Sequence, residues 1–145
     1  MSVHVRLIPV LTLKDGRIIK TVQFDRYHDI GHPVTMGKVF DSQDVDELVF
    51  LDIAAGQENR EPAYDTIEAF AEETTMPLTI GGGIRTTEQI QRLLNLGADK
   101  IAINTSAVAD PKFIRQGAEM FGSQCIVVSI DAIQREGARY EVLIS

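Results

Sequence analysis

Short apolar runs alternate with amphipathic stretches along the chain, and this alternation limits the possible folds more than any other feature of the sequence. The runs are rich in β-branched residues and mostly apolar on both faces, which is typical of strands covered by helices or by a barrel core. Strict alternation of strand and helix predicts a parallel sheet with right-handed crossovers. We expect strands at Val5–Val10, Glu47–Ile53, Pro77–Ile80, Lys100–Asn104 and Cys125–Asp131.

The segments between these runs carry helix start and stop signals. Thr86-Thr87-Glu88-Gln89 resembles a capping box, and the apolar residues that follow at helical spacing lead to Gly97, a typical helix terminator. Asp110-Pro111 provides an N-cap and a first-turn proline, and Gly122 is placed to end that helix. Two less regular helices are expected, one opening at Pro62 and one running roughly from Val34 to Asp44.

Two hairpins interrupt the alternation. Asp15-Gly16 between apolar residues is a strong hairpin signal, so the first strand continues into an excursion that reaches Phe24. The stretch Arg135–Ile144 is typical of a second hairpin, placed after the last parallel strand.

Two architectures fit a parallel sheet of this kind, an open doubly wound sheet and a β/α barrel. The G-x-G-x-x-G fingerprint of dinucleotide-binding sheets is missing after the first strand, which weakens the first alternative. A complete barrel takes ~250 residues, whereas these 145 residues hold four βα units and a fifth strand in a single domain, 1–145. A lone half-barrel exposes parallel edges and an apolar inner face. The chain is therefore expected to be a fragment or to self-associate.

Charge and composition exclude several classes of partner. The net charge of −7 argues against a nucleic-acid or polybasic membrane partner, and no apolar run approaches the ~20 residues of a membrane span. A single cysteine, Cys125, forms no internal disulfide and fits a reducing, cytoplasmic setting. His4, His28 and His32 show no metal-ligand spacing, and no P-loop or zinc signature is present, so neither metal nor cofactor is predicted.

Small and polar residues follow the strands at the ends where β/α folds carry their chemistry. Gly82 and Gly83 in the run Gly81–Arg85 allow backbone N–H groups to approach an anion beside a helix N-terminus, and Asn104 and Thr105 can add side-chain donors. These residues predict a phosphate site shared by neighbouring strands. The alternative is that the glycines simply make a tight turn.

Other strand-end groups are open to two interpretations. Asp131 can act as a general acid or base, or can serve as a structural acceptor, and Asp52 has the same ambiguity. Lys20 can reach a substrate phosphate or remain solvated. Charged residues at the opposite ends of the strands are either ordinary surface charges or a ring of ion pairs about a barrel axis: Arg6, Glu47 and Lys100.

Several stretches spread over nearly the whole chain form a specific set: Arg6–Pro9, Lys14–Lys20, Asp46–Ile53, Gly81–Ile84, Gly97–Lys100, Ile103–Thr105 and Phe121–Ala132. In these stretches the chain resembles the cyclase (synthase) subunit of the imidazole glycerol phosphate synthase family, a β/α barrel of histidine biosynthesis. The resemblance implies the N-terminal half of a TIM (β/α)8 barrel, with four βα units and a fifth strand. It also implies a lyase/amidotransferase-type enzyme of which this chain alone is inactive.

The resemblance assigns roles to the groups singled out above. It implies that a partner glutaminase docks at the strand-start face and that ammonia passes a charged gate to a phosphorylated substrate. The gate residues are then Arg6, Glu47 and Lys100, and Asp131 is one of two catalytic aspartates. The substrate and phosphate contacts implied are Lys20, Asp52, Gly82, Gly83, Asn104 and Thr105.

One position departs from the family pattern. The other catalytic aspartate corresponds to Thr12, whose hydroxyl does not replace a carboxylate base at neutral pH. This departure resembles a paralogous branch from surface-polysaccharide gene sets and implies amidination of a nucleotide-activated acetamido sugar. The histidine-pathway cyclase is the alternative, and a non-catalytic phosphate-binding half-barrel is a second one.

Overall fold

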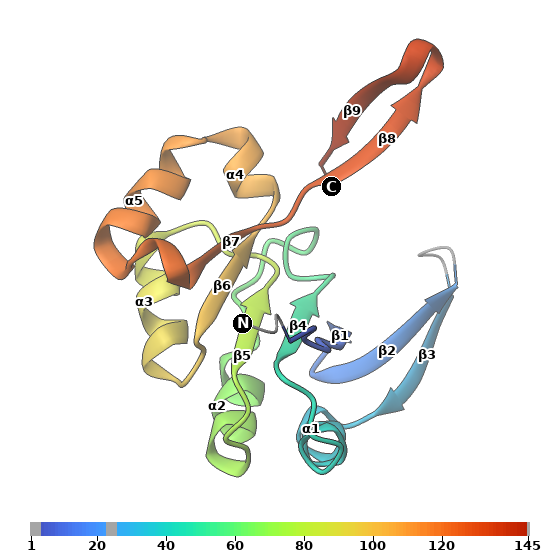
Figure 1. Ribbon diagram of the computed structural model, residues 1–145, viewed down its shortest axis with the longest axis vertical. Helices are drawn as coiled ribbons and strands as arrows, with labels where there is room; N and C mark the ends of the chain where they lie inside the picture. The colour runs from blue at the N-terminus through green and yellow to red at the C-terminus, as the bar shows by residue number, and fades with distance from the viewer. Residues whose placement is uncertain (1–3, 23–25, 145) are drawn as a thin grey trace.

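The computed structural model describes residues 4–22 and 26–144, which form one seven-stranded sheet, a separate hairpin and the helices between them (Figure 1). Five strands run parallel in the order β1-β4-β5-β6-β7, and two antiparallel strands extend the sheet beyond β1 in the order β3-β2-β1. The parallel strands are β1 (Val10–Lys14), β4 (Leu48–Asp52), β5 (Leu78–Gly81), β6 (Lys100–Ile103) and β7 (Ile126–Val128). The antiparallel strands are β2 (Arg17–Val22) and β3 (Arg26–Gly31).

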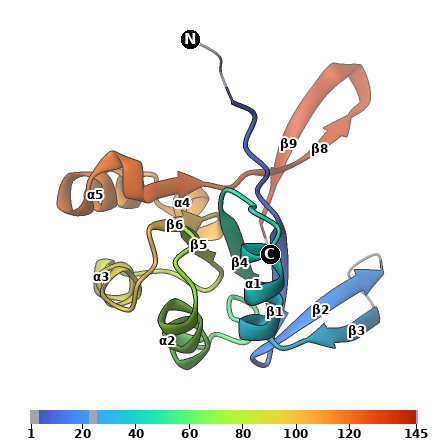
Figure 2. The same ribbon diagram turned by 60° about the horizontal axis from the view of Figure 1, so that its bottom comes forward.

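Helices connect the parallel strands and pack on one face of the sheet (Figure 2). They are α1 (Pro33–Asp41), α2 (Tyr64–Glu73), α3 (Thr87–Asn95) and α5 (Lys112–Phe121), with a short α4 (Thr105–Ala109) after β6. Their apolar sides, such as Phe70 on α2 and Ile90 on α3, pack against alternate residues of the strands. In the part of the chain that is described, no helix is long and apolar enough to cross a membrane.

The strand register separates the two faces of the sheet. Leu11, Phe50, Ile80 and Ile101 occupy one row across it, and all four belong to the buried core under the helices. The adjacent row faces the other way, because successive residues of a strand point to opposite faces: Thr12, Leu51, Gly81, Ala102 and Val127. This second face is partly open to solvent, and 37% of Val127 is exposed.

Local sequence signals predicted several features correctly. Thr86 caps α3 with a complete capping box, in which its side chain accepts from the Gln89 N–H and Gln89 bonds back. Asp15 and Gly16 make the turn between β1 and β2 with φ of 50° and 71°, so this hairpin is confirmed. Gly122 ends α5 with φ of 96°. The predicted end of the first excursion, Phe24, lies outside the described residues.

The predicted boundaries of the first and last parallel strands differ from the observed ones. The first strand begins at Val10 instead of Val5, because Pro9 has no N–H with which to continue the ladder. The last parallel strand, β7, ends at Val128 because its neighbour β6 ends at Ile103, which leaves no further pairing partner. Asp131 therefore does not end that strand. It opens a second hairpin of β8 (Asp131–Arg135) and β9 (Arg139–Leu143), which begins earlier than predicted.

Candidate functional site

The glycine loop after β5 lies at the strand-end edge of the sheet, the edge at which the parallel strands finish. Gly82 and Gly83 have φ of 106° and 70°, a region that favours glycine. A Cβ on Gly82 would lie 2.1 Å from the backbone oxygen of Asp52, and one on Gly83 would lie 2.7 Å from the Cβ of Ala55. Only glycine fits these positions, because the loop after β4 is in direct contact with the glycine loop.

Asn104 and Asp131 meet at the same edge. Asn104 Nδ2 donates to Asp131 Oδ2 at 2.6 Å, although 27 positions separate the residues. The hydroxyl of Ser106, the second residue of α4, donates to the backbone oxygen of Ile84 and joins the start of α4 to the glycine loop. Among the described residues, Asn104 Oδ1 is a buried oxygen that has no hydrogen-bond partner. A buried acceptor without a donor is costly, so this atom marks a place for a donor at the candidate site.

Asp52 is buried and its carboxylate already has several partners. Arg60 donates to both of its oxygens, from Nη1 at 2.7 Å and from Nη2 at 2.8 Å. The backbone N–H groups of Ala54 and Ala55 donate to Oδ1. The hydrogen bonds to Asp52 raise the pKa of Arg60 above its ordinary value. These contacts favour a structural role for Asp52 over direct substrate binding, and they identify Arg60 as a residue that the sequence analysis missed.

Two predicted site residues stand apart from the Asn104–Asp131 contact. Thr12 lies within β1, and its hydroxyl donates to the Ile19 carbonyl at 2.5 Å. Lys20 is exposed on β2 opposite His28. Among the described residues, the hydrogen bonds and ion pairs join neither residue to the glycine loop or to Asp131. Thr105 is the first residue of α4, directly after Asn104.

The three predicted gate residues come together at the strand-start edge, the opposite end of the sheet. Lys100 Nζ lies 2.8 Å from Glu47 Oε1 and 2.7 Å from Oε2. Arg6 Nη1 also donates to Oε1, and Glu47 is buried. Of the two interpretations left open by the sequence, the structure supports the ion-pair cluster.

We expect Lys100→Met to lower the free energy of unfolding by about 2 kcal/mol, because it leaves the buried Glu47 carboxylate with Arg6 alone. Lys38→Met is the matched control: Lys38 pairs with Glu73 at 2.6 Å, and both side chains are more than half exposed. That control should cost less than about 0.5 kcal/mol. Urea unfolding of both variants measures the difference, and equal losses would contradict a special role for the ion pairs of the buried Glu47.

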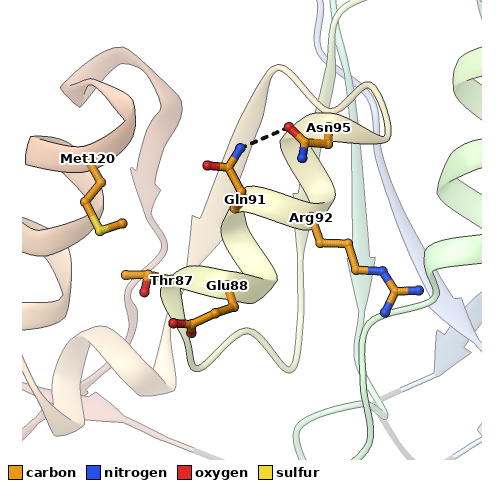
Figure 3. Close-up of a pocket in the computed structure, with 6 residues that line it drawn as sticks. All are labelled: Thr87, Glu88, Gln91, Arg92, Asn95 and Met120. Atoms are coloured by element: carbon orange, nitrogen blue, oxygen red, sulfur yellow. Dashed lines mark hydrogen bonds between the residues drawn. The ribbon is translucent and has the colours of Figure 1, made fainter.

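A shallow hollow of about 350 Å³ lies along the outer side of α3 beside α5 (Figure 3). Its lining contains no predicted site residue: Thr87, Glu88, Gln91, Arg92, Asn95 and Met120. Across residues 4–22 and 26–144, no group of three or more His, Cys, Asp or Glu side chains is arranged to hold a metal.

Comparison with known proteins identifies related chains. The model of the family described as "Histidine biosynthesis protein" matches residues 6–145. The chain is 48% identical over 142 residues to the imidazole glycerol phosphate synthase subunit HisF of Streptomyces coelicolor, covering 98% of this chain and 57% of that one. HisF subunits of Streptomyces avermitilis and Frankia casuarinae are 47% and 48% identical, again over 98% of this chain and 57% of their own length.

The sequence comparison and the observed fold of the chain agree. The chain spans 57% of the length of these relatives, and it holds five parallel strands with the helices that connect them. This arrangement is the N-terminal half of a TIM barrel. The chain belongs to the histidine biosynthesis protein family.

Proposed function

We propose that this chain supplies the first half of the active site of an ammonia-using cyclase of the imidazole glycerol phosphate synthase type. The observation that carries the proposal is the Asn104–Asp131 contact beside the glycine loop, with a buried Asn104 oxygen still lacking a donor. A carboxylate next to a set of backbone amides suits proton transfer on an anionic substrate.

Each residue has a role in this proposal. The amides of Gly82 and Gly83 bind the phosphate of the substrate, with Asn104 and Thr105 adding side-chain donors. Asp131 is the general acid or base, and Lys20 contacts the substrate from β2. Asp52 contributes to binding through the loop that it holds.

The strand-start edge has a separate role. Arg6, Glu47 and Lys100 form an ammonia gate, and a glutaminase partner docks at this face. The supporting observation is the ion-pair cluster around the buried Glu47, at the end of the sheet opposite Asp131. Self-association of the half-barrel, expected from its partly exposed inner face, stays a prediction that light scattering tests.

The comparisons favour the histidine-pathway cyclase over amidination of an activated sugar. The relatives that match at 47–48% identity carry the name imidazole glycerol phosphate synthase subunit HisF. The sugar reaction, preferred above because of Thr12, finds no support among them. Thr12 still favours the sugar reaction, since its hydroxyl donates to the Ile19 carbonyl and offers no carboxylate.

A hybrid protein tests this proposal. It joins these 145 residues to the part of the Streptomyces coelicolor relative that the chain does not cover. We expect Thr12→Asp in the hybrid to raise ammonium-dependent turnover of the imidazole glycerol phosphate synthase substrate by about 100-fold, because it restores a second carboxylate.

The intact relative is the positive control for this assay. Full turnover by the unmodified hybrid would show that Thr12 does not prevent the cyclase reaction, and Thr12 would then no longer favour the sugar reaction. A soluble Thr12→Asp hybrid without turnover would contradict the histidine-pathway proposal.

A further inference from the structure

Arg60 fixes residues 53–61 of the loop that connects β4 to α2; these residues are called the 53–61 loop below. Its guanidinium holds the buried Asp52 carboxylate through two hydrogen bonds at 2.7 and 2.8 Å, and its Nε donates to Glu58 at 2.7 Å. Its backbone N–H donates to the Ala55 carbonyl at 3.1 Å, which closes the loop on itself. With these partners the Arg60 side chain is engaged within its own loop.

The glycine loop rests on this fixed loop. Gly82 packs so closely on the Asp52 carbonyl that a Cβ would not fit between them. A Cβ on Gly83 would lie 3.3 Å from the Arg60 carbonyl oxygen. Arg85, which follows these glycines, forms hydrogen bonds to the 53–61 loop. Its Nη2 donates to the Gly56 carbonyl at 3.0 Å, and its Nη1 donates to the Asn59 side chain. The direction of the Gly82 and Gly83 amides is therefore coupled to the shape of the 53–61 loop.

We propose that Arg60 is a positioning residue for anion binding. By holding the Asp52 carboxylate in place it sets the direction of the Gly82 and Gly83 N–H groups, and it does not contact the anion itself. This inference rests on the proposed phosphate site. It is independent of Thr12 and of the reaction catalysed, because it concerns only how the backbone amides are held. Preorganised donors bind an anion more tightly because no ordering cost is paid on binding.

Inorganic phosphate is the probe for the test. We expect Arg60→Met to weaken phosphate binding to the 145-residue chain at least tenfold by calorimetric titration, and Arg60→Lys to give an intermediate loss. Glu73→Gln removes an exposed carboxylate that pairs with Lys38 outside this loop, and it should leave binding unchanged. Ile18→Val lies in the core on β2, so it should lower the melting temperature without changing phosphate affinity.

Amide NMR gives a second readout that needs no ligand. Arg60→Met should shift the Gly82 and Gly83 amide resonances in the absence of phosphate, and Ile18→Val should not. Unchanged glycine resonances and affinity in Arg60→Met, or in Arg60→Lys if the methionine variant does not fold, would overturn the positioning role. An equal loss of affinity in Ile18→Val would also overturn it. Absence of phosphate binding by the unmodified chain, with the glycine shifts still present, would instead overturn the phosphate site of the proposed function.

Discussion

Replacing Asp131 by asparagine in the Thr12→Asp hybrid is expected to lower ammonium-dependent turnover by about 10³-fold. General acid–base catalysis contributes about 10²–10⁴-fold in rate, and an amide neither accepts nor returns a proton at neutral pH. Asp131 is exposed and accepts from Asn104 Nδ2 at 2.6 Å, so the substitution keeps the shape of the site while it removes the carboxylate.

The control for this prediction lies on the same hairpin. Glu141→Gln removes a carboxylate that pairs with Arg135 at 2.7 Å, and this pair is exposed. We expect unchanged turnover from the Glu141 variant and little change in unfolding free energy from either variant. Retention of more than a tenth of the activity by Asp131→Asn would show that another group carries the proton.

Gly82→Ala is expected to lower the free energy of unfolding by about 4 kcal/mol, the largest loss of stability that we predict. Alanine at a positive φ costs about 1–2 kcal/mol, and here φ is 106°. The new Cβ would also lie 2.1 Å from the Asp52 backbone oxygen, a clash that forces the two loops apart and adds about 1–3 kcal/mol. Urea unfolding measures the loss, and phosphate affinity should fall with it.

Alanine substitutions at two other glycines separate the conformational cost of a positive φ from the cost of the clash. A Cβ on Gly137 meets nothing within 4 Å, and Gly137 has φ of 76°, so Gly137→Ala reports the conformational cost alone. Gly56 is also open, and its φ lies outside the left-handed region, so Gly56→Ala should be nearly neutral. A loss from Gly82→Ala no larger than that from Gly137→Ala would contradict the close packing of the two loops.

Much of the fold was predictable because its signals are local. The Thr86 capping box, the Asp15-Gly16 turn and the Gly122 terminator each depend on the conformations of a few consecutive residues. The alternation of apolar strands with amphipathic helices predicted the parallel sheet, since both faces of such strands must be covered. The same reasoning indicated that polar residues at successive strand ends share an edge, and the Ser106–Ile84 hydrogen bond joins the segments that follow β6 and β5 there.

Other features depended on partners far away in the chain. The end of β7 is set by the length of β6, so the sequence around Asp131 could not reveal that this residue opens a hairpin. The ion-pair cluster around the buried Glu47 joins residues separated by 41 and 53 positions. From the residues alone, without the family resemblance, these charges were indistinguishable from ordinary surface charges.

The sequence by itself determined the alternation of parallel strands with helices and the local caps and turns, because backbone preference and apolar periodicity act over short distances. Tertiary structure alone decided that Arg60 satisfies the buried Asp52 and that the glycine loop packs on the loop they hold. A buried carboxylate requires a charged or hydrogen-bonding partner, but which cation provides it depends on how the chain folds back on itself.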